Sequence, residues 1–204
     1  MTAYLDPGRR ERKRQALHEM LLVTANQLFR ERGIAGTTVD DIAEAADVAR
    51  QTVFNHFPYK EAFALELGAA VIHHAGERAQ ALLEAGMPAL DVVQLVGEWV
   101  LEAATHDPDV AIVVARELLH SDPVRAARAA THVPLCELLQ ALLEQAREEG
   151  GIRESFPTDV AAARFSSVIA SLTAQVACRE AGALRRDLAI SFDMLLHGIV
   201  KRSA

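Results

Sequence analysis

The sequence predicts an all-α protein of about nine helices, and three observations lead to this fold class. Apolar residues recur at three- and four-residue steps along 14–32, the period of an amphipathic helix that ends at Gly33. Alternating runs of β-branched residues, which are typical of strands, are absent from the sequence. The seven prolines fall where helices are expected to begin or end. With 204 residues, half of them hydrophobic, the chain can bury a substantial core.

The helical pattern divides the chain into a head and a body. The expected helices, with boundaries uncertain by about three residues, are 10–32, 38–45, 49–55, 59–85, 88–105, 108–120, 123–149, 157–181 and 184–202. Because only the second and third are very short, we expect an N-terminal three-helix domain at 1–58. A C-terminal helical bundle is expected at 59–204.

Charge is distributed unevenly between these two parts. The net charge is −7, yet residues 1–61 contain as many basic as acidic side chains, so the excess acidity belongs to the remainder. Five basic residues crowd together near the N-terminus: Arg9, Arg10, Arg12, Lys13 and Arg14. A basic arm on a neutral head favours a polyanionic partner. The alternative is a solvated, disordered tail.

Cysteine usage and hydropathy favour a soluble, cytoplasmic protein that does not associate with membranes. Cys136 and Cys178 stand far apart and match no zinc spacing and no disulfide framework. The sequence has no run of 18 apolar residues. The histidines show no metal-binding spacing, so we expect no metal and no cofactor.

Two short helices and a turn stand out in the head. Thr38 and Asp41 have the spacing of a capping box at the start of the first short helix. A turn is then needed at Asp47, a residue type that tolerates the left-handed conformation. The second short helix begins near Arg50.

The second short helix presents a polar face. Val48, Val53 and Phe57 can point inward, which leaves a polar set pointing outward: Arg50, Gln51, Thr52, Asn55 and His56. This is a helix-turn-helix pattern. Arginine can donate two hydrogen bonds to a guanine edge, and glutamine or asparagine can pair with adenine. The pattern therefore favours DNA binding over the alternative, a polar face that only meets water.

The segment TTVDDIAEAADVARQTVFNHFPYKEA resembles the N-terminal signature of the TetR (tetracycline-repressor-like) family of bacterial transcriptional regulators, with similarity over roughly 14–65. The resemblance implies base contacts from Arg50, Gln51 and Asn55. It implies backbone phosphate contacts from Thr38, Thr52, His56 and Lys60. It also implies further DNA contacts from the arm, Arg9, Arg10, Arg12, Lys13 and Arg14. Asp47, Ala49 and Phe54 depart from the family's usual Gly, Ser and Tyr.

The last two helices are expected to form a dimer interface. In 157–181 one helical face is bulky and the other is built of small residues, so both can be buried. We expect a four-helix interface across a two-fold axis, formed by Ala162, Ser166, Ala170, Thr173, Ile190 and Met194. The alternative is burial of these faces within one monomer.

The sequence indicates a ligand pocket in the body less clearly. Its candidate residues are Trp99, Arg116, His120 and Phe165. Arg116 and His120 stand four apart on a helix that is apolar nearly all round, and a buried arginine needs either an acidic ligand or a nearby glutamate. Trp99 is either core or pocket wall.

The family resemblance implies a regulator, most simply a repressor that binds a pseudo-palindromic operator as a homodimer and is released by an unidentified small molecule. An activator, or a regulator controlled by a partner protein, is the first alternative. A helical carrier or enzyme without DNA binding is a more remote one. We expect no enzyme, since the sequence shows no nucleophile–base motif and no glycine-rich phosphate loop.

Overall fold

The computed structural model describes residues 8–119 and 134–199. The chain divides into two compact units between Ala64 and Leu65, whereas the sequence placed the domain boundary after residue 58. We call the unit up to Ala64 the head and the unit from Leu65 onward the body.

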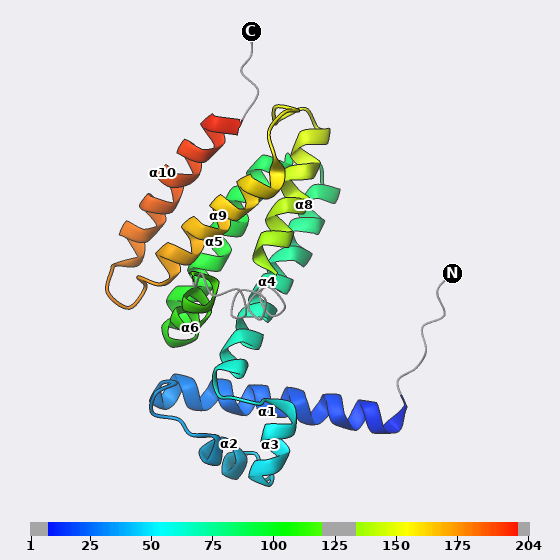
Figure 1. Cartoon of the computed structure of the whole chain (residues 1–204), viewed down its shortest axis with the longest axis vertical. Coiled ribbons are helices and arrows are strands. Elements are labelled where there is room, and N and C mark those ends of the chain that lie inside the picture. Colours follow the sequence, from blue (N-terminus) through cyan, green and yellow to red (C-terminus); the bar gives the residue numbers. More distant parts are fainter. Residues whose placement is uncertain (1–7, 120–133, 200–204) are drawn as a thin grey trace. The chain divides into compact units, whose positions relative to one another are not determined.

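Within the described residues the fold is all-α, with nine helices and no strand, as the sequence predicted (Figure 1). The head contains α1 (Arg9–Arg32), α2 (Val39–Ala45) and α3 (Arg50–His56). Helix α4 (Glu61–Glu84) begins in the head and continues in the body. The body also contains α5 (Ala89–His106), α6 (Pro108–Leu119), α8 (Leu135–Glu148), α9 (Thr158–Thr173) and α10 (Ala181–Ile199).

An aromatic stack forms much of the head core. The Phe57 ring, directly after α3, stacks on Phe63 of α4 with ring centroids 3.7 Å apart, and Phe29 of α1 meets Phe63 edge-on at 6.4 Å. Phe57 also stacks on His18 of α1, with ring centroids 4.5 Å apart. Since Val53 of α3 is also fully buried, this core fixes α3 against α1 and the start of α4.

The body core is centred on α5 and α9, which pack against each other and against α6, α8 and α10. In Figure 1, α9 and α10 run side by side as an antiparallel hairpin. Phe165 of α9 and Phe192 of α10 are buried and meet edge-on at 4.8 Å. A Cβ on Gly97 of α5 would lie 2.8 Å from the Phe192 ring, so this glycine allows α5 and α10 to approach closely.

The predicted helix 157–181 was too long, because α9 ends at Thr173. Beyond it, i-to-i−3 hydrogen bonds take over, as in the bond from the Cys178 N–H to the Gln175 carbonyl. The turn is tied to α10 by an ion pair of 2.6 Å between Arg179 and Asp187. Part of the predicted helix 123–149 lies outside the described residues, which resume before α8.

Three of the predicted dimer-interface residues are buried within the chain itself. Ala162, Ala170 and Thr173 of α9 are at most 5% exposed in the single chain. Small side chains allow close helix packing, and the body uses that property for its own core. These three residues are therefore not available to a partner subunit, and the alternative of burial within one monomer holds for them.

Arg116 lies near the end of α6 and is exposed, so the sequence-based expectation of a buried arginine was wrong.

No described helix is long and apolar enough to cross a membrane.

Candidate nucleic-acid interface

Helix α2 begins with the capping box that the sequence predicted. The Asp41 N–H donates to the Thr38 hydroxyl at 3.1 Å, and the Asp41 carboxylate accepts from the Thr38 hydroxyl at 2.6 Å and its N–H at 2.7 Å. The hydrogen bond from the Thr38 hydroxyl is the main cause that lowers the pKa of Asp41. Thr38 therefore stabilises the start of α2 in the free protein.

The turn between α2 and α3 is a Schellman motif with aspartate in the position that usually holds glycine. Asp47 has φ = 52°, the only positive φ of a non-glycine residue in the described chain. The Asp47 N–H donates to the Glu44 carbonyl at 3.1 Å, and the Val48 N–H donates to the Ala43 carbonyl at 3.0 Å. The left-handed turn expected at Asp47 is confirmed.

The three predicted base-contacting side chains are exposed on α3, and each already has a neighbour. The Arg50 guanidinium donates from Nη1 to Asp40 Oδ2 of α2 at 2.6 Å and lies 5.3 Å from the centre of the Phe54 ring. The Gln51 amide donates to the amide oxygen of Asn55, one turn further along α3, at 3.1 Å. These contacts order the polar face before any DNA is bound.

Lys60 is engaged within the head. Its Nζ donates to the backbone carbonyls of Ile34 at 2.6 Å and Thr37 at 3.0 Å, both between α1 and α2. These bonds connect the segment between α1 and α2 to the residues that precede α4. The predicted phosphate contact therefore competes with a structural role. Thr52, another predicted phosphate contact, is half-buried.

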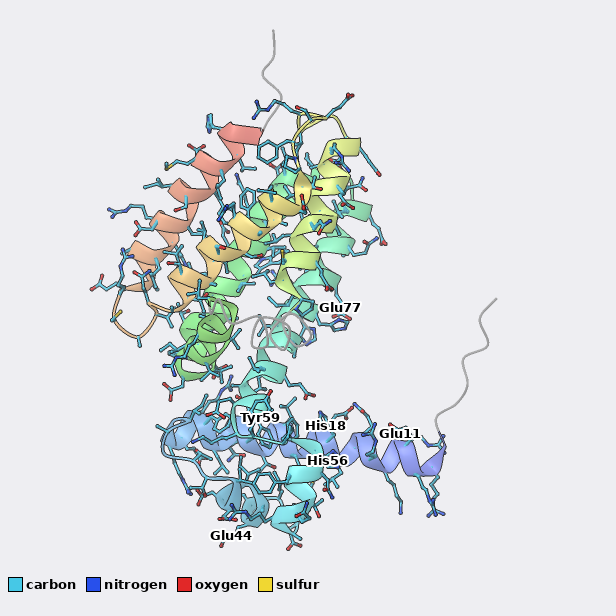
Figure 2. The ribbon with its side chains drawn as sticks, in the orientation of Figure 1. Glu11, His18, Glu44, His56, Tyr59 and Glu77 are labelled. Atoms are coloured by element: carbon cyan, nitrogen blue, oxygen red, sulfur yellow. The ribbon has the colours of Figure 1, made fainter. Side chains whose placement is uncertain are left out.

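His56, the last residue of α3, is paired with a histidine of α1. The Nδ1 atoms of His56 and His18 lie 3.3 Å apart, so one ring donates a proton and the other accepts it (Figure 2). Burial, followed by the charges of His18 and Arg14, lowers the pKa of His56. The side chain predicted to reach a phosphate is thus neutral more readily than an isolated histidine.

The predicted basic arm is helical. Arg9 to Arg14 form the first turns of α1, and their side chains are exposed. Arg14 donates to Glu11 at 2.8 Å. The arm thus presents its cations from a regular helix.

The predicted pocket residues of the body lie in different surroundings. Trp99 is half-buried, with the Arg78 guanidinium 3.9 Å above its ring, and Phe165 is fully buried. His120 lies outside the described residues. On α9, the buried hydroxyls of Ser166 and Thr173 have no hydrogen-bond partner among the described residues. Those residues also contain no His, Cys, Asp and Glu group able to hold a metal ion.

Two partners of the interface were missed by the sequence-based prediction. Asp40 contacts Arg50 from α2, and His18 contacts His56 from α1, 38 positions away. Apart from their opposite charges, nothing in the local pattern links Asp40 to Arg50, and no local signal links the two histidines.

A short helix with an exposed polar face, joined by a tight turn to a capped helix on a small apolar core, defines the class of the head. It is a helix-turn-helix unit of the kind that transcriptional regulators use to read DNA. Residues 21–67 match the model of the bacterial regulatory proteins of the tetR family. Residues 69–198 match the C-terminal domain of TetR/AcrR family transcriptional repressors. The chain belongs to the TetR family, whose members are DNA-binding regulators and not enzymes.

Two relatives are similar to this chain over about a third of its length. TcmR of Streptomyces glaucescens, an HTH-type transcriptional regulator, is 44% identical over 59 residues, which cover 29% of this chain and 26% of TcmR. EthR of Mycobacterium tuberculosis is 39% identical over 64 residues, which cover 31% of this chain and 30% of EthR. The chain thus spans less than a third of each relative's length.

Solved structures extend the similarity to both units. FadR of Thermus thermophilus, a TetR family transcriptional repressor in complex with lauroyl-CoA, is 31% identical, with a TM-score of 0.81. That match covers 92% of this chain and 97% of FadR. FadR of Bacillus subtilis, in complex with stearoyl-CoA, has a TM-score of 0.67 over 89% of this chain and 98% of its own. At 20% identity it shows the fold alone.

Proposed function

We propose that this protein is a ligand-responsive transcriptional repressor that binds a pseudo-palindromic DNA operator as a homodimer. The observation that carries the proposal is the exposed polar face of α3, where Arg50, Gln51 and Asn55 project from a helix fixed by a compact core. Side chains of these three types pair with purine edges in the major groove. The basic first turns of α1 add charge that attracts the DNA backbone.

The proposed dimer forms through the hairpin of α9 and α10. Ile190 and Met194 stand one turn apart on α10 and are 52% and 71% exposed. Exposed apolar side chains that lie together mark a surface that another molecule can cover. Val160 of α9 is 45% exposed as well. A two-fold dimer would bury these side chains and place two heads on one operator.

The proposed effector is a fatty acyl-CoA. This proposal rests on the 31% identity to the Thermus thermophilus repressor that binds lauroyl-CoA, a similarity that spans the body of both proteins. The body also offers two polar groups for such a ligand. These are the unpartnered hydroxyls of Ser166 and Thr173, which are seven residues apart and so share one face of α9.

Helix α4 would connect the two activities, because it begins in the head and continues through the body. An effector that favours a body conformation with the wrong head spacing lowers DNA affinity. Such coupling amounts to about 1–3 kcal/mol and is reciprocal, so DNA must weaken effector binding by the same factor. A regulator of this kind acts where the bacterial chromosome lies, and we therefore propose a cytoplasmic location.

The DNA-binding proposal is tested by a mobility-shift assay with the DNA that flanks the protein's own gene. We expect a specific complex whose affinity falls steeply as salt is raised, because bound cations are displaced from the DNA. If only weak binding is seen, equal for unrelated DNA of the same length, the protein is not a sequence-specific regulator of that DNA.

The effector proposal is tested on the same complex. Lauroyl-CoA should release the DNA, whereas free CoA and laurate at equal concentration serve as matched controls for its two halves. Release by none of the three would reject an acyl-CoA effector and leave the DNA-binding proposal intact.

A further inference from the structure

The Arg50 side chain makes two contacts before DNA arrives. Its Nη1 donates to Asp40 Oδ2 at 2.6 Å. The centre of the Phe54 ring, one helical turn further along α3, lies 5.3 Å from the guanidinium carbon. One contact comes from α2 and the other from α3, so together they restrict a long side chain that would otherwise sample many rotamers.

Stability does not explain this arrangement. The side chains of Arg50 and Asp40 are 60% and 62% exposed, and ion pairs at such sites contribute little to folding. Asp40 also places a negative charge beside a surface that is to meet phosphates, which works against DNA binding. Asp40 lies in the first turn of α2, where a negative charge is favourable to the helix dipole, but that role does not require the contact with Arg50.

Geometry supplies a role for that contact. A guanidinium carries five N–H donors in a planar fork, and Asp40 accepts a hydrogen bond from only one of its nitrogens. Asp40 does not engage Nε or Nη2, and the parallel N–H groups of these two nitrogens can bond to O6 and N7 of a guanine. The hydrogen bond to Asp40 fixes the orientation of the guanidinium plane. It thereby fixes the direction in which the remaining N–H groups can meet a base.

We propose that Asp40 is a positioning residue that orients Arg50 toward one guanine of the operator and so sets base preference at that position. This inference rests on the proposed DNA-binding function and deepens it. Phe54 supports the same orientation through its ring contact with the guanidinium. The departure of Phe54 from the family's usual tyrosine does not remove this support, because the aromatic ring is retained.

The test compares base preference with overall affinity. Binding is measured on the operator and on duplexes that carry each other base pair at every position, and Arg50→Ala identifies the position that Arg50 reads. Asp40→Ala and Asp40→Asn are then compared with Glu44→Gln. Glu44 is an exposed carboxylate on the same helix and is not paired with Arg50 (Figure 2).

Asp40→Ala should reduce the preference for guanine at that one position by roughly 2- to 12-fold, the effect of releasing one ordered, rotamer-rich side chain. Asp40→Asn, which keeps a hydrogen-bond acceptor, should give a smaller reduction at the same position. Glu44→Gln should raise affinity for all sequences alike, because it only removes a negative charge near DNA.

Three results would overturn the inference. The first is that Asp40→Ala behaves like Glu44→Gln, and the second is that it sharpens the preference, which would mean that Asp40 holds Arg50 away from DNA. The third is that Arg50→Ala changes no position. Failure of the proposed function is distinguishable, because wild-type protein would then show no preference among the duplexes at all.

Discussion

At the scale of single residues, Lys60 offers a choice between two roles. Its ammonium group donates to the backbone carbonyls of Ile34 and Thr37. Lys60→Met keeps the aliphatic stem and removes both donors, so we expect it to lower the unfolding free energy of the head by about 1.5–3 kcal/mol. Amide hydrogen exchange of the head residues, measured at increasing urea concentrations, gives this loss. Lys13→Met, on the exposed start of α1, is the control. Unchanged protection together with uniformly weaker DNA binding would instead assign Lys60 to a phosphate.

The histidine pair makes the stability of the head depend on pH. Burial and the neighbouring charges of His18 and Arg14 lower the pKa of His56 in the folded state, so the unfolded chain binds a proton more readily. The contribution of neutral His56 to the stability of the head is therefore complete above the ordinary histidine pKa. It is lost as the pH falls through the lowered pKa that His56 has in the folded state.

We expect the head of the wild-type protein to lose stability between about pH 7.5 and pH 5.5, and His56→Gln to lose much less over the same range. Denaturant unfolding of both proteins across this range checks the difference. A head that grows more stable on acidification, or equal slopes for the two proteins, would contradict the assigned role of the pair.

The residues of the interface were largely predictable from sequence, whereas their contacts were not. The exposure of Arg50, Gln51 and Asn55 follows from helical periodicity around Val53, which must be buried. The pairing of Arg50 with a carboxylate depends on how α2 meets α3, which no local pattern records. The expected role of Lys60 came from its place at the start of the next helix and from family resemblance, and neither shows which carbonyls lie within its reach.

At the scale of elements, two glycines on α4 distinguish close helix packing from open space. A Cβ on Gly68 would lie 2.6 Å from Val114 of α6, whereas a Cβ on Gly76 would meet nothing closer than 3.8 Å. Gly68→Ala should destabilise the body by about 1–3 kcal/mol, because the β-branched valine has little freedom to move. Gly76→Ala should stabilise it by about 0.5–1 kcal/mol, because alanine loses less backbone entropy in a helix. Thermal unfolding of both variants checks the contrast, and equal effects would mean that α6 does not constrain α4.

The helices themselves were predictable, since amphipathic periodicity and capping signals are local. The end of α9 was not, because Ala174 and Gln175 are good helix formers and no glycine or proline follows at once. After the end of α9, Arg179 pairs with Asp187 on the next helix, a tertiary contact that no local pattern records. Likewise, periodicity showed that the small face of α9 is buried, yet it could not say whether the same chain or a partner covers it.

At the scale of the whole molecule, the exposed apolar side chains of α10 predict the assembly. Replacing both Ile190 and Met194 by glutamate should convert a dimer to monomers, because two charges would enter each buried surface. Sedimentation equilibrium at micromolar protein measures the change. Val23→Glu is the matched control, since Val23 is 68% exposed on α1 of the head. A wild-type monomer, or a double variant that remains dimeric, would refute the proposed interface.

The central claim is that α3 of each subunit enters a major groove and reads bases there. Protection of guanine N7 from methylation on the DNA that flanks the protein's own gene tests it most directly, because N7 faces the major groove. We predict two protected patches on one side of the duplex, about 10 base pairs apart or a multiple of that spacing, and loss of guanine protection with Arg50→Ala. Retardation of the DNA without any protected guanine, or protection unchanged in Arg50→Ala, would contradict the account.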